Sequence, residues 1–195
     1  MRALRLTALT LMAAGTALVA SALYIPAKAA LAQVLLERAW ARTQAGESGA
    51  RPWPWADITP VAVLEVPRLG ERSIVLEGAS GQAMAFGPGH MVNTPPIGAR
   101  GTAVIAAHRD TQFSYLRDVK NGDRIVVATA DGTHRAFRVV DTRVVRADAS
   151  GIDPAEGGPT GARLALVTCY PFNGVLRGPL RYVVLADRET ATAER

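Results

Sequence analysis

Residues 164–170 have the sequence Leu-Ala-Leu-Val-Thr-Cys-Tyr, an apolar run that includes the only cysteine of the chain, Cys169. Gly161 stands upstream of this run and Pro171 follows it directly. An apolar run of this length between turn residues is typical of a buried strand rather than of a helix. The sequence therefore predicts a core strand with the thiol of Cys169 near its C-terminal end, although a lone cysteine can also be a small buried hydrophobic residue.

The remainder of the C-terminal part of the chain has similar β character. Further runs rich in β-branched and apolar residues lie at 61–66, 73–76, 102–107, 124–129, 134–145 and 180–186. Asp131-Gly132 separates two of these runs and predicts a tight hairpin. We also expect a short helix within 78–86, a helical turn within 111–119, and loops at 146–163 and 172–179. About seven or eight short strands at this spacing predict a mainly all-β domain, either a closed barrel or a sandwich.

The N-terminal segment predicts a membrane anchor. Arg2 and Arg5 precede Leu6–Ile25, a segment without charged residues. Its length matches a hydrocarbon core of about 30 Å, and the basic residues ahead of it favour a cytoplasmic N-terminus with the remaining chain outside. Ala20-Ser21-Ala22 also resembles a signal-peptidase cleavage site. We favour an uncleaved anchor because the apolar run continues beyond this site, and both interpretations export the domain.

Residues 27–44 predict an amphipathic helix just outside the membrane. Its apolar residues recur at steps of three and four, which is the helical period; they are Leu31, Val34, Leu35 and Ala39. This face could lie on lipid or on the domain, and a simple stalk is equally open. Prolines prevent continuation of the helix, so we place a linker at about residues 44–57. Trp53 and Trp55 within it are candidates for docking on the domain or at the membrane interface.

Charge and cysteine content exclude several classes of function. Residues 1–50 contain five basic and two acidic residues, so they carry +3 of the formal net charge of +5. The rest has no basic run with interleaved aromatic residues, and we therefore expect no nucleic-acid partner. A single cysteine excludes an intrachain disulfide and zinc sites with several thiolates, and His90, His108 and His134 lack ligand spacing. Acidic residues in loop 146–163 are more typical of solvated side chains, so we expect no metal and no cofactor.

Three reactive side chains lie in or beside predicted strands. They are Cys169, His108 after the apolar run 102–107, and Arg181 inside the run 180–186. A catalytic thiol requires a positive neighbour or a base. Histidine suits proton transfer to and from an amine, and arginine can stabilise an oxyanion but cannot act as a base. Together they suit acyl transfer, whereas each alone is also compatible with a structural role.

These residues lie in segments that resemble the sortase family. Leu166-Val167-Thr168-Cys169 resembles the family's Leu-x-Thr-Cys strand, Ala107-His108-Arg109-Asp110 its histidine segment, and Leu180–Val184 its last arginine-containing strand. The order of these motifs and their separations also match, over roughly residues 58–187. Ala107 and Thr102 stand where the family often has glycine and asparagine. The short, anchored form most resembles the sortases of Gram-negative bacteria.

The resemblance implies a closed eight-stranded β-barrel with one or two short helices after a transmembrane helix. The implied activity is that of a cysteine transpeptidase, a peptidase-like enzyme acting on a protein with a Leu-Pro-x-Thr-Gly-like C-terminal sorting signal. Cys169 would form a thioester acyl-enzyme, His108 would transfer protons to the leaving amine and from the amine acceptor, and Arg181 would stabilise the oxyanion. Thr168 is an expected substrate contact.

The implied organisation places the enzyme at the cytoplasmic (inner) membrane as a single-pass protein with a periplasmic catalytic domain. Its segments are a cytoplasmic N-terminus at 1–5, the anchor at 6–25, a juxtamembrane helix and linker at 26–57, the catalytic barrel at 58–187 and a tail at 188–195. Two alternatives remain open. One is another exported cysteine acyl-transferase, similar to an L,D-transpeptidase, although its usual Ser-x-Gly-Cys setting is missing. The other is a non-catalytic β-barrel binding module.

Overall fold

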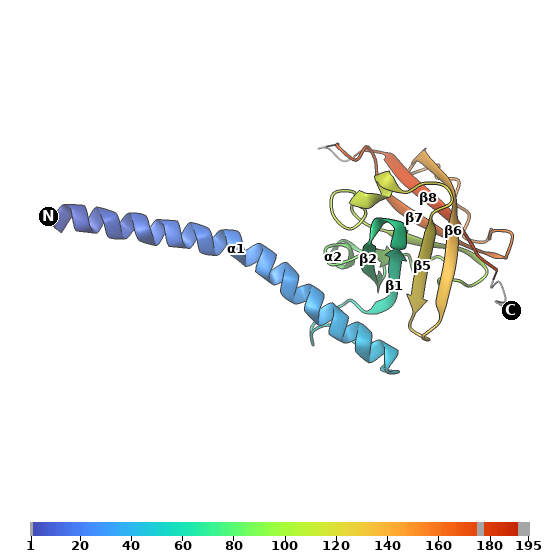
Figure 1. Cartoon of the computed structure of the whole chain (residues 1–195), viewed down its shortest axis with the longest axis horizontal. Coiled ribbons are helices and arrows are strands. Elements are labelled where there is room, and N and C mark those ends of the chain that lie inside the picture. Colours follow the sequence, from blue (N-terminus) through green and yellow to red (C-terminus); the bar gives the residue numbers. More distant parts are fainter. Residues whose placement is uncertain (1, 175–177, 191–195) are drawn as a thin grey trace.

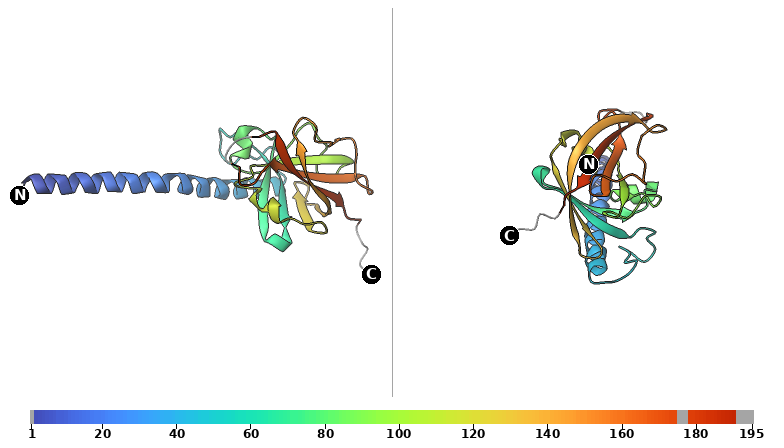
Figure 2. Two further views of the ribbon diagram at one scale, coloured as in Figure 1. Left: turned by 90° about the horizontal axis from the view of Figure 1, so that it is seen from above. Right: turned by 90° about the vertical axis from the view of Figure 1, so that its right-hand side faces the viewer.

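The computed structural model describes residues 2–174 and 178–190. A long helix, α1 (Arg2–Gln44), extends away from a β-barrel, and both Figure 1 and Figure 2 show its N-terminal half projecting far beyond the barrel. The predicted loop 172–179 and the predicted C-terminal tail lie partly outside the described residues.

Within these residues, eight strands close into a barrel, as predicted. Their order around the barrel is β1-β2-β3-β4-β7-β8-β6-β5. Neighbouring strands are antiparallel except for the pairs β2–β3 and β4–β7, which are parallel. The strands are β1 (Pro60–Val66), β2 (Glu71–Glu77), β3 (Gly89–His90), β4 (Gly101–Ala106), β5 (Arg124–Thr129), β6 (His134–Arg146), β7 (Ala162–Cys169) and β8 (Leu180–Arg188).

Three short helical segments connect the strands. They are η1 (Pro67–Leu69), α2 (Gly81–Met84) and η2 (Ser114–Asp118). The side chain of Ser80 caps α2 by accepting a hydrogen bond from the N–H of Ala83 at 3.2 Å. The two-residue strand β3 was not predicted. A Cβ atom at Gly89 would lie 2.2 Å from the carbonyl oxygen of Gly78, so glycine allows this strand to approach the segment after β2.

Strand β7 lies between β4 and β8, and both of its faces are covered by apolar residues. Leu164 and Leu166 point into the main core inside the barrel, together with residues such as Phe113 and Phe137. Ala165 belongs to a second, smaller cluster on the outer face. Burial on both faces explains why the sequence of this strand is a nearly continuous apolar run rather than an alternating one.

Helix α1 passes through Pro26 without ending. Proline lacks the N–H that would complete the helical hydrogen bond and its ring crowds the preceding turn, so a proline inside a helix causes a bend. Figure 1 shows α1 bent near its middle. Part of α1, within Leu11–Gln44, is long and apolar enough to cross a membrane.

The C-terminal part of α1 docks on the barrel. Gln33 donates a hydrogen bond to the carbonyl of Phe86 at 2.9 Å, and Arg72 of β2 pairs with Glu37. Of the predicted apolar face, Leu31 and Val34 are 58% and 49% exposed, whereas Ala39 is buried against the barrel. The other buried residues of this part of the helix are Ala32, Leu36 and Trp40.

The linker after α1 folds back onto the contact between the helix and the barrel. Trp53 packs edge-to-face against Phe86, with ring centroids 5.2 Å apart, while Trp55 is 80% exposed. Leu36 and Trp40 of α1 form a further apolar cluster with Val63 of β1. The helix, the linker and the first two strands therefore pack as one unit.

Candidate active site

Cys169 is the last residue of β7 and is half-buried. In the antiparallel pairing of β7 with β8, its direct partner is Arg181. Residues directly opposite each other on an antiparallel pair have side chains on the same face, with Cβ atoms about 4.5–5.5 Å apart. The sheet register therefore places Arg181 beside Cys169 on the outer face of the barrel.

The parallel pairing of β4 with β7 brings His108 to the same end of the barrel. Ala106 pairs with Val167, and the N–H of Ala107 continues the ladder by donating to the carbonyl of Val167 at 3.2 Å. His108 and Cys169 each lie two residues beyond the Ala106–Val167 pair. Two strand pairings thus gather the three predicted residues from distant parts of the sequence, and His108 is half-buried there.

Thr168 occupies the opposite face of β7 and is 2% exposed. Its hydroxyl donates a hydrogen bond to the carbonyl of Ala107 at 2.7 Å. The structure thus gives Thr168 a contact with the residue just before His108, and a contact with substrate stays a prediction. Among the described residues, none other than glycine has a positive φ, so the methyl group of Ala107 fits without strain where the family often has glycine.

Arg181 is held by the backbone at the start of β8. Its Nη1 group donates to the carbonyls of Gly178 and Leu180, each at 2.8 Å. Within the described residues no hydrogen bond involves its Nε or Nη2. Because a guanidinium has five N–H donors in a fixed plane, these groups can donate to a substrate oxygen while Nη1 keeps the side chain in place.

A small apolar cluster covers the outer face of the barrel on strands β4, β7 and β8. Residues of β6 and of the loops before β4 and before β7 pack against it. Its buried members are Val104, Ala165, Val183 and Leu185, and its partly buried members are Met91, Val145, Ile152 and Val167.

The loop between β6 and β7 is tethered to β4 by Thr102. The N–H of Thr102 donates to the carbonyl of Pro154 at 2.9 Å, and its hydroxyl donates to the carbonyl of Glu156. Two acidic side chains of this loop have local partners. Asp148 pairs with Arg146, which lowers the pKa of its carboxyl group, and Asp153 accepts from the N–H of Ala155 at 2.8 Å.

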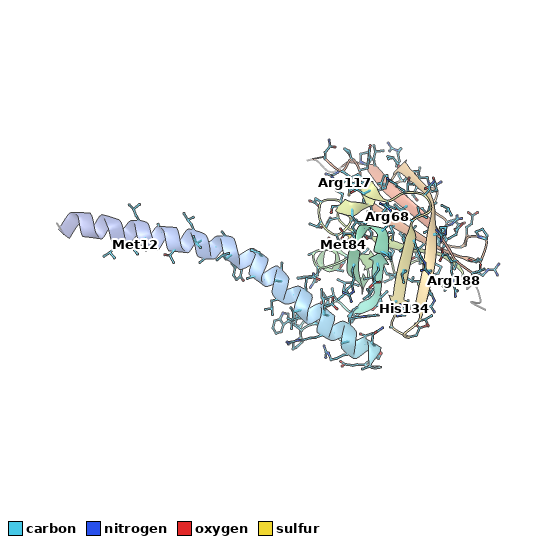
Figure 3. All side chains as sticks on the ribbon, in the orientation of Figure 1. Met12, Arg68, Met84, Arg117, His134 and Arg188 are labelled. Carbon is cyan, nitrogen blue, oxygen red and sulfur yellow. The ribbon has the colours of Figure 1, made fainter. Side chains whose placement is uncertain are left out.

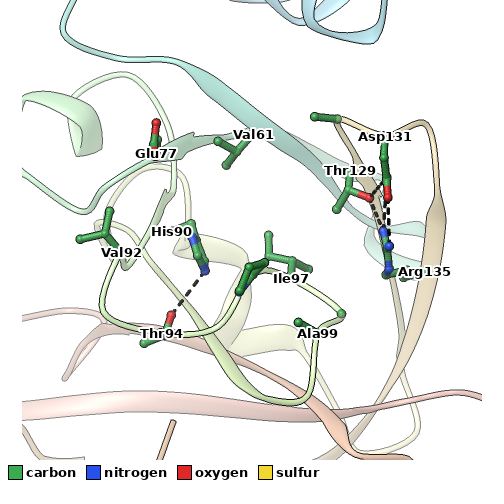
Figure 4. Close-up of a pocket in the computed structure, with 13 residues that line it drawn as sticks. Val61, Glu77, His90, Val92, Thr94, Ile97, Ala99, Thr129, Asp131 and Arg135 are labelled. Carbon is green, nitrogen blue, oxygen red and sulfur yellow. Dashed lines mark hydrogen bonds and ion pairs between the residues drawn. The ribbon is translucent and has the colours of Figure 1, made fainter. Parts of the chain in front are cut away.

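A concavity of about 590 Å³ lies at the other end of the barrel (Figure 4). Strand β2 runs opposite to β4, so its last residue, Glu77, lines the end away from His108. Polar side chains of this concavity contact neighbouring side chains or the backbone. His90 Nε2 lies 2.9 Å from the carbonyl oxygen of Pro95, and Arg135 pairs with Asp131 at 3.1 Å. We assign no chemistry to it.

Comparison with known proteins agrees with this arrangement. A family model described as the sortase domain matches residues 64–189, which cover strands from β1 to β8. The chain belongs to the sortase family. The acyl-transferase and binding-module alternatives are therefore not favoured. Membership confirms the family expected from the sequence motifs, while the roles of Cys169, His108 and Arg181 in this protein stay predictions.

Individual sortases resemble the chain over similar lengths. Sortase D of Bacillus subtilis (strain 168) is 28% identical over 128 residues, which span 66% of this chain and 63% of that relative. The structure of sortase E from Streptomyces avermitilis is 28% identical with a TM-score of 0.56, covering 67% of this chain and 88% of that one. Sortase A from Corynebacterium diphtheriae, at 20% identity and a TM-score of 0.61, covers 85% and 87% respectively and supports the fold.

Proposed function

We propose that this sortase is a cysteine transpeptidase with Cys169 as nucleophile, His108 as proton donor and acceptor, and Arg181 as oxyanion-stabilising residue. The observation that carries the proposal is the register of β4, β7 and β8, which gathers these three side chains at one end of the barrel. Family membership supports the same assignment through the positions that match its motifs.

The proposed reaction has two acyl-transfer steps. The Cys169 thiolate attacks a backbone carbonyl of the substrate, forming a C–S bond, and the negative charge on the carbonyl oxygen is stabilised by N–H donors of Arg181. The C–N bond then breaks as His108 protonates the departing amine. In the second step His108 removes a proton from an incoming amine, which attacks the thioester and releases the thiolate. Water in place of the amine gives hydrolysis.

The proposed substrate is a protein with a Leu-Pro-x-Thr-Gly-like C-terminal sorting signal. The end of the barrel at which β7 and β8 pair Cys169 with Arg181 offers a place for such a signal. The polypeptide then approaches the thiol along β7 and β8, with its scissile carbonyl beside Arg181. The amine acceptor is a second partner, and the chemistry requires only that its amino group be uncharged at attack.

The proposed location is the cytoplasmic membrane, with a single span and the barrel on the extracytoplasmic side. The apolar helix α1 and the two arginines before Leu6 support this orientation. We also propose that the protein is of the membrane-anchored type found in Gram-negative bacteria. That subtype rests on the short anchored form of the chain, since the relatives named above come from other bacteria.

The test uses the full chain in detergent with a panel of Leu-Pro-x-Thr-Gly-like peptides and triglycine as amine. We expect release of the C-terminal fragment that begins with glycine and transfer of the N-terminal part to triglycine. An acyl adduct on Cys169 should be detectable by mass spectrometry. Cys169→Ala should abolish all three. Cleavage that persists in Cys169→Ala, or a Cys169 thiol that a small alkylating reagent labels only after unfolding, would refute the mechanism.

A further inference from the structure

Arg109 follows His108 directly and is only 9% exposed. Arginine is seldom buried to this extent unless its guanidinium has partners in the protein. Here the Nη2 group donates a hydrogen bond to the carbonyl of Gly174, in the loop after Cys169. Neither strand pairing nor the proposed chemistry requires this contact, so it calls for a separate explanation.

The guanidinium packs closely on the turn that contains Gly174. The N–H of Gly174 donates to the carbonyl of Pro171 at 3.0 Å, closing a turn directly after the cysteine strand. A Cβ atom at position 174 would lie 3.1 Å from Nη1 of Arg109 and 3.1 Å from the carbonyl oxygen of Pro171. The turn therefore has little room for a side chain and presents its backbone carbonyl to the arginine.

Two side-chain hydrogen bonds thus flank the proposed catalytic pair. Before the pair, the hydroxyl of Thr168 donates to the carbonyl of Ala107; after it, Arg109 donates to Gly174. His108 lies between Ala107 and Arg109, and Cys169 lies between Thr168 and Gly174. The chain after Arg109 is also fixed, because the N–H of Phe113 donates to the carbonyl of His108 at 3.0 Å.

We propose that Arg109 is a positioning residue that fixes the histidine segment against the loop after the nucleophile. This inference rests on the proposed function. The β4–β7 ladder, which ends at the Ala107–Val167 bond, and the hydroxyl of Thr168 link the two segments before the catalytic pair, and Arg109 supplies the link after it. A guanidinium suits this task because it stays charged and holds several donors in one plane. Its effect on the reaction is indirect, through the separation of His108 from Cys169.

The start of the loop has contacts of its own, so loss of Arg109 should not unfold it. Phe172 contacts Tyr170 and Tyr182, with ring centroids 6.2 and 5.1 Å apart, and Arg117 lies over the Phe172 ring at 5.2 Å. We therefore expect Arg109→Ala to fold and to release mainly the turn at Gly174.

The experiment compares Arg109→Ala and Arg109→Lys with Arg138→Ala in the full chain in detergent. Arg138, in β6, serves as an exposed control: it donates to another glycine carbonyl, that of Gly122 at 2.8 Å, and also pairs with Glu189. We expect Arg109→Ala to lower kcat for peptide transfer by about ten- to a hundredfold, with KM changed less than about twofold. Arg109→Lys, which keeps a donor, should recover part of kcat, and Arg138→Ala should keep the kcat of the wild-type protein.

A second readout does not depend on activity. Amide hydrogen exchange in the segment 170–174 should become faster in Arg109→Ala and remain unchanged in Arg138→Ala. Unchanged exchange in Arg109→Ala would overturn the proposal, whether or not the protein transfers peptides. Unchanged kcat in an active protein, or equal losses of kcat in Arg109→Ala and Arg138→Ala, would overturn it as well. An inactive wild-type protein whose exchange responds as expected would refute the proposed function and leave the contact established.

Discussion

Replacing Thr168 with valine removes a hydroxyl group while keeping the shape of the side chain. Thr168 is 2% exposed, and its hydroxyl donates to the carbonyl of Ala107, a residue that is itself 5% exposed. A buried acceptor that loses its partner costs about 1–3 kcal/mol. The ladder bond from the N–H of Ala107 to Val167 is retained, so we expect the barrel to keep its fold at reduced stability.

Thermal unfolding of the full chain in detergent, followed by circular dichroism, measures this cost. For a barrel of roughly this size, 1 kcal/mol corresponds to about 4 °C, so the midpoint should fall by roughly 4–12 °C. Thr168→Ser keeps the hydroxyl and serves as the control; we expect it to lose less stability than Thr168→Val and to retain more peptide transfer.

The alternative role of Thr168, direct contact with substrate, has a different signature. A hydroxyl used only for substrate would leave the unfolding midpoint of Thr168→Val unchanged and would raise KM rather than lower kcat. A midpoint within about 1 °C of the wild-type value would therefore refute our interpretation of the Ala107 contact. A fall in both the midpoint and kcat would support it.

Two further predictions concern regions away from the site. Leu36→Ala should lower the free energy of unfolding by about 2–5 kcal/mol because Leu36 is fully buried between α1 and the barrel. Amide hydrogen exchange in β1 and β2 should then become faster. Leu31→Ala, at a position that is 58% exposed, should leave this exchange unchanged. Arg68→Ala should reduce the dependence of stability on pH in acid. A hydrogen bond from Arg68 lowers the pKa of the buried Asp123, so this contribution is complete above the unfolded-state pKa of about 4 and is lost as pH falls below it. Urea unfolding should show that the free energies of unfolding of wild type and variant differ less at pH 3 than at pH 7. An equal difference at both pH values would contradict the assignment.

The sequence predicted the strands of the barrel best where composition and turn residues agree. β5 was expected at 124–129 and has those bounds, and β7 was expected at 164–170 and spans Ala162–Cys169. β3 was missed because Gly89-His90 has no apolar alternation and forms a strand only through its neighbours β2 and β4. Local patterns identify such a segment poorly, since its pairing is entirely long-range.

The contacts around the candidate site were harder to predict than its candidate residues. Cys169, His108 and Arg181 stand out by residue type within apolar runs. Arg109, by contrast, is one more charged residue in the sequence, and its burial depends on a carbonyl 65 residues away. The membrane anchor and the juxtamembrane helix were expected as separate segments at 6–25 and 27–44, whereas α1 continues from one to the other through Pro26.

The continuity of α1 determines how the barrel can search for its partners. With Leu6–Ile25 in a bilayer, the first docked residue, Ala32, lies about 10 Å beyond the end of the span at 1.5 Å per residue. Figure 3 places Met84, in α2, on the side of the barrel that faces the N-terminal part of α1. With α1 anchored as proposed, its continuity would hold the barrel close to the membrane, and encounters with partners would depend on lateral diffusion and on rotation about the membrane normal. A substrate protein would then have to present its cleavage site near the membrane surface.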